Sequence, residues 1–285
     1  MGPREVVEGP VRFGIAELVP DPARTAGWAV SVDGVLQSYV DLADPTYLKM
    51  PFTVWIAQVL DRHWPRGASV SAVHVGGGGF TLPRYLAASR PGSEQTVFEL
   101  DGQLVDLVPE HLELDGVPGL RVRTRDGQAG IAELPDADVD LVVLDVVRGG
   151  DVVTDLAAVE FLLEIARVLR TGGLYTANIW DAADLSFARR AAAAAVEVFQ
   201  NVLTFAEAGV LEKLRPGNVV IAASTSELPS TELHEWAASA EDHVFCLTPT
   251  QLTKVYGKAA PLTKADPLAR PVPAVSRWRP GYRFT

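Results

Sequence analysis

The chain has 285 residues, of which 48% are hydrophobic and 21% charged, as expected for a soluble globular protein with a buried core. Its formal net charge of -11 repels phosphate backbones and anionic lipids, so neither nucleic acid nor a membrane is an expected partner. The single cysteine excludes an intramolecular disulfide and a cysteine-based zinc cluster, and no metal site is expected. Because the sequence shows neither a signal-peptide pattern nor a long apolar run, the expected compartment is the cytoplasm.

A small β unit is predicted at the N-terminus. Within residues 11–44, Asp33 and Gly34 lie between two short runs of alternating apolar residues, which is a hairpin signal. A helix is expected from about Thr46 to Trp64, because its apolar residues are spaced three and four apart. We therefore predict an N-terminal β-hairpin unit over residues 1–45, followed by a larger domain over residues 46–285.

Strands and helices alternate from Ser69 onward. The predicted strands are residues 70–75, 96–100, 120–124, 139–147 and 174–180, and the predicted helices are residues 82–88, 104–112, 155–170 and 185–199. Thr171, Gly172 and Gly173 form a stop signal for the third helix. Two more strands are expected at 202–210 and 218–224, and the proline-rich stretch from Pro261 is expected to be irregular. This alternation indicates an α/β fold with a parallel sheet covered by helices on both faces.

Four consecutive glycines, Gly76, Gly77, Gly78 and Gly79, follow the first strand of this alternating region. Glycines at such a place let the backbone approach a ligand closely, although a tight turn is the simpler interpretation. Glu99 ends the next strand, 20 residues after Gly79, where an acid accepts hydrogen bonds from ribose hydroxyls. A dinucleotide needs a third glycine, and that position is Thr81 or Leu82 here, so the spacing favours a nucleoside without a pyrophosphate.

Further candidate residues stand at later strand ends. Asp126 and Gly127 follow the third of these strands, where Asp126 is placed either to accept from an adenine amine or to form an Asp-Gly turn. Asp145 ends the most apolar strand and is placed either to orient or deprotonate a substrate or to cap the next segment. His74 lies within a strand and is expected to be a hydrogen-bonded core residue.

The order of these motifs resembles that of the spermidine synthase family, the polyamine aminopropyltransferases. The hairpin ending in Gln37 is similar to the family's L-D-G-x-x-Q, and the segment ending in Tyr47 is similar to D-E-x-x-Y. The glycine loop resembles G-G-G-D-G, and the segment from Glu99 to Asp101 resembles E-[IL]-D. Asp126 and Gly127 match the family's D-G, and residues 145–148 occupy the place of D-S-S-D.

The resemblance implies a Rossmann-like methyltransferase-type doubly wound sheet with a small N-terminal β unit, assembled as a homodimer. It implies S-adenosylmethionine or its decarboxylated form as donor and a small-molecule amine, such as a polyamine, as acceptor. By residue, it implies that Gln37 contacts the donor's tail, Glu99 the ribose and Asp126 the adenine. It also implies that Tyr47 and Asp145 line the acceptor site as catalytic residues.

Three acids of the family pattern are replaced in this chain. The loop aspartate is Gly79, the second aspartate of D-S-S-D is Arg148, and the glutamate two residues after the tyrosine is Lys49. The expected function is therefore a spermidine synthase-like transferase with altered acceptor contacts. The alternatives are a methyltransferase that uses intact S-adenosylmethionine and a non-catalytic nucleoside-binding protein.

Overall fold

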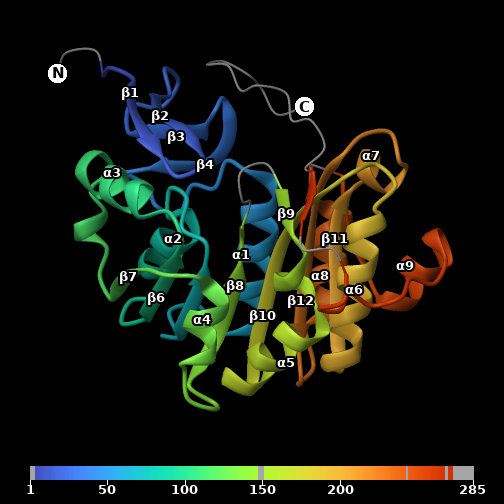
Figure 1. Ribbon diagram of the computed structural model, residues 1–285. Helices are drawn as coiled ribbons and strands as arrows, with labels where there is room; N and C mark the ends of the chain where they lie inside the picture. The colour runs from blue at the N-terminus through green and yellow to red at the C-terminus, as the bar shows by residue number, and fades with distance from the viewer. Residues whose placement is uncertain (1–3, 147–150, 242, 267–268, 272–285) are drawn as a thin grey trace.

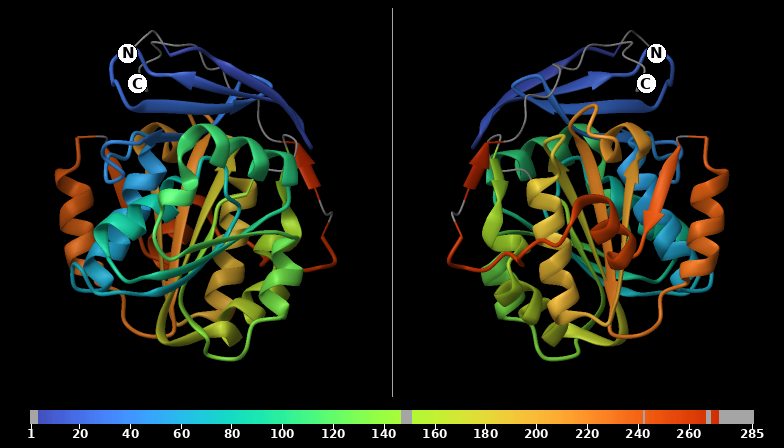
Figure 2. Two further views of the ribbon diagram at one scale, coloured as in Figure 1. Left: turned by 90° about the vertical axis from the view of Figure 1, so that its left-hand side faces the viewer. Right: turned by 90° about the vertical axis from the view of Figure 1, so that its right-hand side faces the viewer.

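The computed structural model describes residues 4–146, 151–241, 243–266 and 269–271. Its N-terminal part is an antiparallel sheet with the strand order β1-β2-β3-β4. These strands are β1 (Val7–Val11), β2 (Gly14–Pro20), β3 (Gly27–Val32) and β4 (Val35–Asp41). Asp33 and Gly34 connect β3 to β4 with φ values of 49° and 76°, which suits a hairpin turn with two positive φ angles. The predicted hairpin is thus confirmed, within a larger sheet that lies at the top of Figures 1 and 2.

The second sheet has eight strands in the order β13-β11-β12-β10-β8-β5-β6-β7. They are β5 (Ser71–Val75), β6 (Glu94–Glu99), β7 (Leu120–Thr124), β8 (Val139–Leu144), β10 (Leu169–Asp181), β11 (Asn201–Glu207), β12 (Gly217–Ser224) and β13 (Val244–Leu247). Five neighbouring strands, from β7 to β10, are parallel, as predicted. The last three pair antiparallel, because the short link between β11 and β12 cannot make a parallel crossover.

Helices cover both faces of this sheet (Figures 1 and 2). Helices α1 (Pro51–His63), α2 (Thr81–Ser89) and α8 (Ser230–Ser239) contribute to the core on one face. Helices α5 (Val159–Val168), α6 (Ser186–Val198) and α9 (Pro249–Tyr256) contribute to the core on the other face, next to α4 (Gly127–Ala132). The remaining helical elements are α3 (Gly102–Leu112), α7 (Ala208–Leu211) and the short 3-10 turns Leu114–Gly116 and Thr154–Ala157.

Several predicted boundaries are wrong, each for a local reason. The first helix begins at Pro51 rather than near Thr46, because proline favours the first helical position and forces the preceding residue to be extended. The helix predicted over 155–170 is shorter, because residues 154–157 form a 3-10 turn and Leu169 is already extended beside β8. Its expected stop signal, Gly172 and Gly173, lies instead at an irregularity within β10. The strand expected over 202–210 ends at Glu207, and helix α7 follows.

One strand lies in the stretch that was expected to be irregular. Strand β14 (Ala269–Pro271) pairs antiparallel with β9 (Asp151–Val153), so the prediction from Pro261 onward is wrong at this place. In the described part of the chain, no helix has the length and apolarity needed to cross a membrane. The same residues contain no group of three or more metal-binding side chains.

A shared apolar core joins the N-terminal sheet to the larger one. Val30 and Val40 of the small sheet pack in one cluster with Phe80, Val97 and Leu104 of the larger part. Phe80 comes directly after the four glycines and is fully buried. The apolar residues of β3 and β4 therefore place the small sheet directly over the glycine loop.

Candidate functional site

The glycine loop lies between β5 and α2, and two of its glycines have positive φ, Gly76 at 97° and Gly78 at 51°. A side chain at Gly76 would overlap the backbone oxygen of Asp145, and one at Gly77 would lie 2.9 Å from the Phe80 ring. These contacts are with the protein itself. Close packing alone therefore accounts for Gly76 and Gly77, in keeping with the simpler interpretation considered from the sequence.

The second half of the loop contacts the N-terminal sheet. The Ser38 hydroxyl of β4 accepts a hydrogen bond from the Gly79 amide at 2.9 Å. A Cβ atom at Gly78 would lie 2.5 Å from the Ser38 oxygen, and one at Gly79 would lie 2.9 Å from the Ser38 Cβ and 3.2 Å from Val30. Position 79, which is aspartate in the family pattern, consequently has no room for a side chain.

Glu99 lies at the end of β6 and binds the loop from the other side. Its Oε2 accepts a hydrogen bond from the Gly77 amide at 2.7 Å, and its Oε1 accepts one from the Asp101 amide at 2.9 Å. The side chain is half-buried. Each carboxylate oxygen can accept a further hydrogen bond, so this acid is able both to order the loop and to contact a ligand.

Asp101 lies at the N-terminus of α3. Its Oδ1 accepts from the amides of Gln103 and Leu104, and its Oδ2 accepts from the amide of Arg12. The side chain is 3% exposed. One oxygen thus caps this helix, and the other fastens the segment between β1 and β2 of the N-terminal sheet. Since both oxygens have these partners, we do not include Asp101 in the ligand contacts proposed below.

Asp126 lies at the N-terminus of α4, one strand beyond Glu99. Its Oδ1 accepts from the Ala129 amide at 3.1 Å, as in a capped helix. The two strand ends are joined where the Arg125 amide donates to the backbone oxygen of Glu99. Gly127 is close-packed, because a side chain there would overlap Val75. The structure thus places Asp126 near Glu99 but also gives it a capping role.

Asp145 follows β8 and lies beside Asn178 of β10. Asn178 donates to its Oδ1 at 2.9 Å. Burial raises the pKa of Asp145 from 3.8 to about 6, and the hydrogen bond from Asn178 opposes that rise. A carboxyl group with such a pKa is well suited to accept a proton near neutral pH. Arg148, which the sequence places in the position of a second aspartate, lies outside the described residues.

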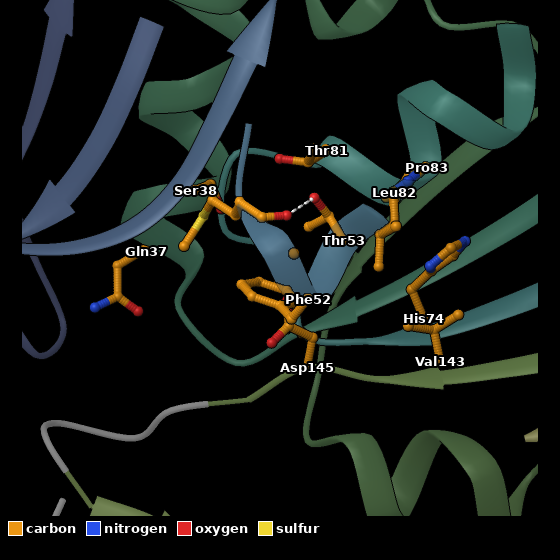
Figure 3. Close-up of a pocket in the computed structure, with 13 residues that line it drawn as sticks. Gln37, Ser38, Phe52, Thr53, His74, Thr81, Leu82, Pro83, Val143 and Asp145 are labelled. Atoms are coloured by element: carbon orange, nitrogen blue, oxygen red, sulfur yellow. Dashed lines mark hydrogen bonds between the residues drawn. The ribbon is translucent and has the colours of Figure 1, made fainter. Parts of the chain in front are cut away.

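A pocket lies between β4, α1, α2 and the glycine loop (Figure 3). The space within it, open mouth included, is about 340 Å³. The residues that line it are Gln37, Ser38, Met50, Phe52, Thr53, His74, Gly76, Gly77, Thr81, Leu82, Pro83, Val143 and Asp145. The pocket therefore brings together four residues predicted from the sequence: Gln37, two loop glycines and Asp145.

The lining residues Gln37 and His74 also have polar partners within the protein. The Gln37 amide donates to the backbone oxygen of Val35 at 3.2 Å. The His74 ring donates from its Nε2 to Gln95 at 2.9 Å, because the Gln95 amide nitrogen is itself bonded to Pro83. Burial lowers the pKa of His74 to about 4, so the ring is neutral. The prediction of a hydrogen-bonded core histidine is confirmed.

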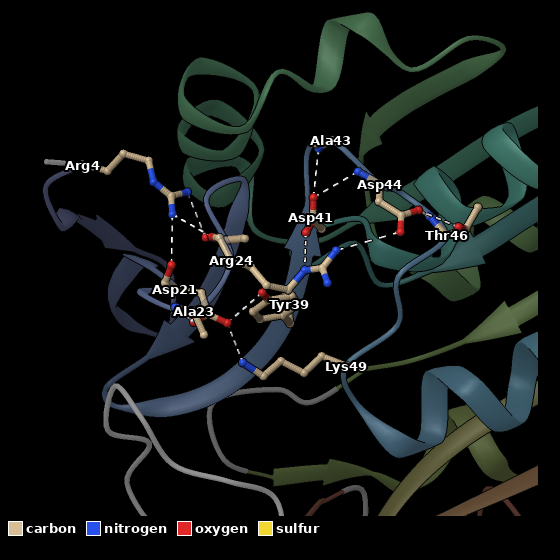
Figure 4. A network of polar contacts seen from close by, with 11 residues as sticks. Arg4, Asp21, Ala23, Arg24, Tyr39, Asp41, Ala43, Asp44, Thr46 and Lys49 are labelled. Carbon is tan, nitrogen blue, oxygen red and sulfur yellow. Dashed lines mark hydrogen bonds and ion pairs between the residues drawn. The ribbon is translucent and has the colours of Figure 1, made fainter. Parts of the chain in front are cut away.

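Tyr47 is not among the pocket-lining residues. The Arg24 guanidinium, which binds Asp41 in a polar network of the N-terminal sheet (Figure 4), lies 3.6 Å from the centroid of the Tyr47 ring. This ring also contacts Tyr39, with the centroids 6.0 Å apart. Lys49, two residues later, binds Asp21 at 2.7 Å. The role of Tyr47 at an acceptor site stays a prediction.

The sequence analysis missed two polar residues of the site, Ser38 and Asn178. Ser38 directly follows Gln37, but its importance depends on the contact between β4 and the glycine loop. Asn178 directly follows Ala177, which pairs with Leu144 at the end of β8, and its side chain reaches Asp145 across the sheet. A polar residue near the carboxyl end of a parallel strand is the signal that could have identified Asn178.

Comparisons with family models and with curated proteins gave no match for this chain. Among solved structures, a probable spermidine synthase from Corynebacterium glutamicum superposes with a TM-score of 0.83 and 26% sequence identity. The alignment covers 97% of this chain and 99% of that one. The chain has a spermidine synthase-like fold.

Two further solved structures share this fold at lower sequence identity. A spermidine synthase in complex with the transition-state analogue AdoDATO has a TM-score of 0.59 and 14% identity, and the alignment covers 88% of this chain and 83% of that one. Human methyltransferase-like protein 13 in complex with SAH has a TM-score of 0.51 and 18% identity, with 74% and 92% covered. The predicted methyltransferase-type α/β fold is thereby confirmed.

Proposed function

We propose that the spermidine synthase-like chain is a transferase that binds an S-adenosyl donor beside the glycine loop and transfers a group to a small acceptor. The observation that carries this proposal is the juxtaposition of Glu99, the loop and Asp145. Glu99 binds the Gly77 amide, while Gly76 lies against the backbone of Asp145. In the proposed pose, a nucleoside held by Glu99 directs its 5′ end to the pocket beside Asp145.

Glu99 and Asp126 supply the nucleoside half of the proposed site. They follow adjacent parallel strands, whose carboxyl ends meet at one edge of the sheet. Glu99 is assigned to the ribose hydroxyls and Asp126 to the adenine amine. Because the loop residues are glycines, the loop places no side chain between this edge of the sheet and the pocket.

Asp145 supplies the reactive half. In the proposed reaction, a nucleophile attacks a carbon attached to the positive sulfur, the carbon–sulfur bond breaks, and a neutral thioether leaves. Asp145 accepts the proton that the nucleophile loses, and Asn178 orients its carboxylate through the hydrogen bond to Oδ1. Alignment of the two reactants in one small pocket contributes the rest of the acceleration.

A methyltransferase is the second candidate. The packing of Ser38 and Val30 against Gly79 favours it, because no acid can stand there to hold an aminopropyl ammonium group. Titration with S-adenosylmethionine and with its decarboxylated form distinguishes the two candidates. Preference for the intact donor supports the methyltransferase, and preference for the decarboxylated donor supports aminopropyl transfer.

Replacement of Glu99 tests the nucleoside site. Glu99→Ala is expected to weaken binding of 5′-methylthioadenosine at least tenfold, because charge-assisted hydrogen bonds contribute about 1.5–3 kcal/mol. It should also lower the melting temperature, since Glu99 binds the Gly77 and Asp101 amides. Calorimetry measures the affinity, and Glu110→Ala, at a 74% exposed side chain on α3, is the matched control. Equal affinity of Glu99→Ala and the unchanged chain would remove Glu99 from the site.

A further inference from the structure

The pocket beside Asp145 offers little negative charge to an acceptor. Among its described lining residues, Asp145 is the one carboxylate. His74 is neutral, because burial lowers its pKa to about 4. Five lining side chains are apolar: Met50, Phe52, Leu82, Pro83 and Val143. An ammonium group placed against these apolar side chains would lose its hydration without gaining a partner.

Two buried carboxylates of the N-terminal part, Asp21 and Asp41, are already paired with cations of the chain. Asp21 is 7% exposed, and its Oδ2 accepts from Lys49 at 2.7 Å and from the Tyr39 hydroxyl at 2.8 Å. Asp41 is 4% exposed and accepts from Arg24 at 2.5 Å. Figure 4 shows both pairs in one network of the N-terminal sheet. The network borders the pocket at Tyr39, whose backbone oxygen accepts a hydrogen bond from the lining residue Thr81 at 3.0 Å.

The aromatic faces of the same network are also covered by cations of the chain. The Lys49 ammonium lies 4.4 Å from the Tyr39 ring centroid, and the Arg24 guanidinium lies 3.6 Å from that of Tyr47. Tyrosine faces attract ammonium groups of ligands by the same electrostatic interaction. Lys49 and Arg24 thus bind Asp21 and Asp41 and also cover the rings of Tyr39 and Tyr47. A polycationic ligand would have to displace them in order to pair with these four side chains.

We infer that the acceptor carries one ammonium group, so that it is a small monoamine rather than a diamine or longer polyamine. The inference rests on the proposed function, because it assigns the Asp145 pocket to the acceptor. Asp145 pairs with the single amine and later accepts its proton. A second ammonium group would be left among Met50, Phe52 and Leu82, or would have to displace Lys49 from Asp21.

Two amines of equal carbon number test this assignment. Protein saturated with 5′-methylthioadenosine is titrated with n-butylamine and with 1,4-diaminobutane in 150 mM salt, which screens general attraction to the acidic chain. Butylamine is expected to bind at least tenfold more tightly than the diamine. Asp145→Asn should weaken butylamine binding at least tenfold, whereas Asp44→Asn, which alters a 51% exposed acid of the network, should leave it unchanged.

Diamine binding that equals or exceeds butylamine binding would overturn the inference, as would the absence of binding by either amine to the nucleoside complex. The first titration, with 5′-methylthioadenosine alone, tests the proposed function separately. If the nucleoside itself does not bind, the proposed function fails before the amines are compared. If it binds and the diamine is preferred, the failure belongs to the acceptor inference alone.

Discussion

Asp145 is the residue whose ionisation most clearly links the site to stability. Burial raises its pKa from 3.8 to about 6, with the Asn178 hydrogen bond opposing the rise. Between these two pH values the folded chain binds the proton more tightly than the unfolded chain does. The contribution of Asp145 to the free energy of unfolding therefore falls as the pH rises through that window. The cost of its buried charge is fully present above about pH 6.

Asp145→Asn is consequently expected to stabilise the protein at pH 7.5, by about 1–3 kcal/mol, because it removes the charge and keeps an acceptor oxygen for Asn178. At pH 4 the advantage should disappear. Thermal unfolding at the two pH values measures the difference, with Asp106→Asn, at an exposed position on α3, as the control. If the difference in melting temperature between Asp145→Asn and the unchanged chain were the same at both pH values, the shifted pKa would be contradicted.

At the scale of elements, the glycine loop and β4 depend on each other. Ser38 accepts from the Gly79 amide, and a Cβ atom at Gly79 would meet Ser38 and Val30 within 3.2 Å. Both neighbours belong to sheet strands, so neither can shift without moving β3 or β4. Restoring the aspartate of the family pattern at position 79 is therefore expected to displace the small sheet instead of creating an amine site.

Gly79→Asp should lower the melting temperature by several degrees, because steric overlap and a buried unpaired carboxylate each cost about 1–3 kcal/mol. Gly116→Ala is the matched control, since a side chain there meets nothing within 4 Å. Ser38→Gly in the same chain as Gly79→Asp should recover part of the loss. Unchanged stability of Gly79→Asp would show that the loop and β4 separate more readily than their packing indicates.

The same elements show how far the sequence predicts the fold and site. Alternating apolar runs and turn residues predicted the β3–β4 hairpin and the parallel strands, because those signals are local. The antiparallel pairing of β11, β12 and β13 escaped prediction, since it depends on which strands become neighbours. The roles of Ser38 and Asn178 likewise arise from contacts between distant segments. Asp101 illustrates the converse, because its place in a motif gave no sign that it caps α3 and binds the Arg12 amide.

At the scale of the whole molecule, the structure bears on the division at residue 45 predicted from the sequence. One apolar cluster contains Val30 and Val40 from before that boundary and Phe80, Val97 and Leu104 from after it. All five side chains are buried. Because neither part can keep this cluster covered alone, we expect the two parts to unfold together even though they form separate sheets.

Replacing Val30, which is fully buried, tests this coupling. Val30→Ala is expected to remove about 1–2 kcal/mol and to lower the melting temperature of the entire chain in a single transition, because the lost methyl groups face Phe80 and the larger sheet. Ile15→Ala changes a 47% exposed residue of the same small sheet and should leave that temperature nearly unchanged. Circular dichroism follows the helices, all of which come after residue 45, while tryptophan fluorescence also includes Trp28 of β3. Coincident shifts by the two methods support one cooperative unit, since a small sheet that melted alone would shift the fluorescence transition and leave the helical signal in place.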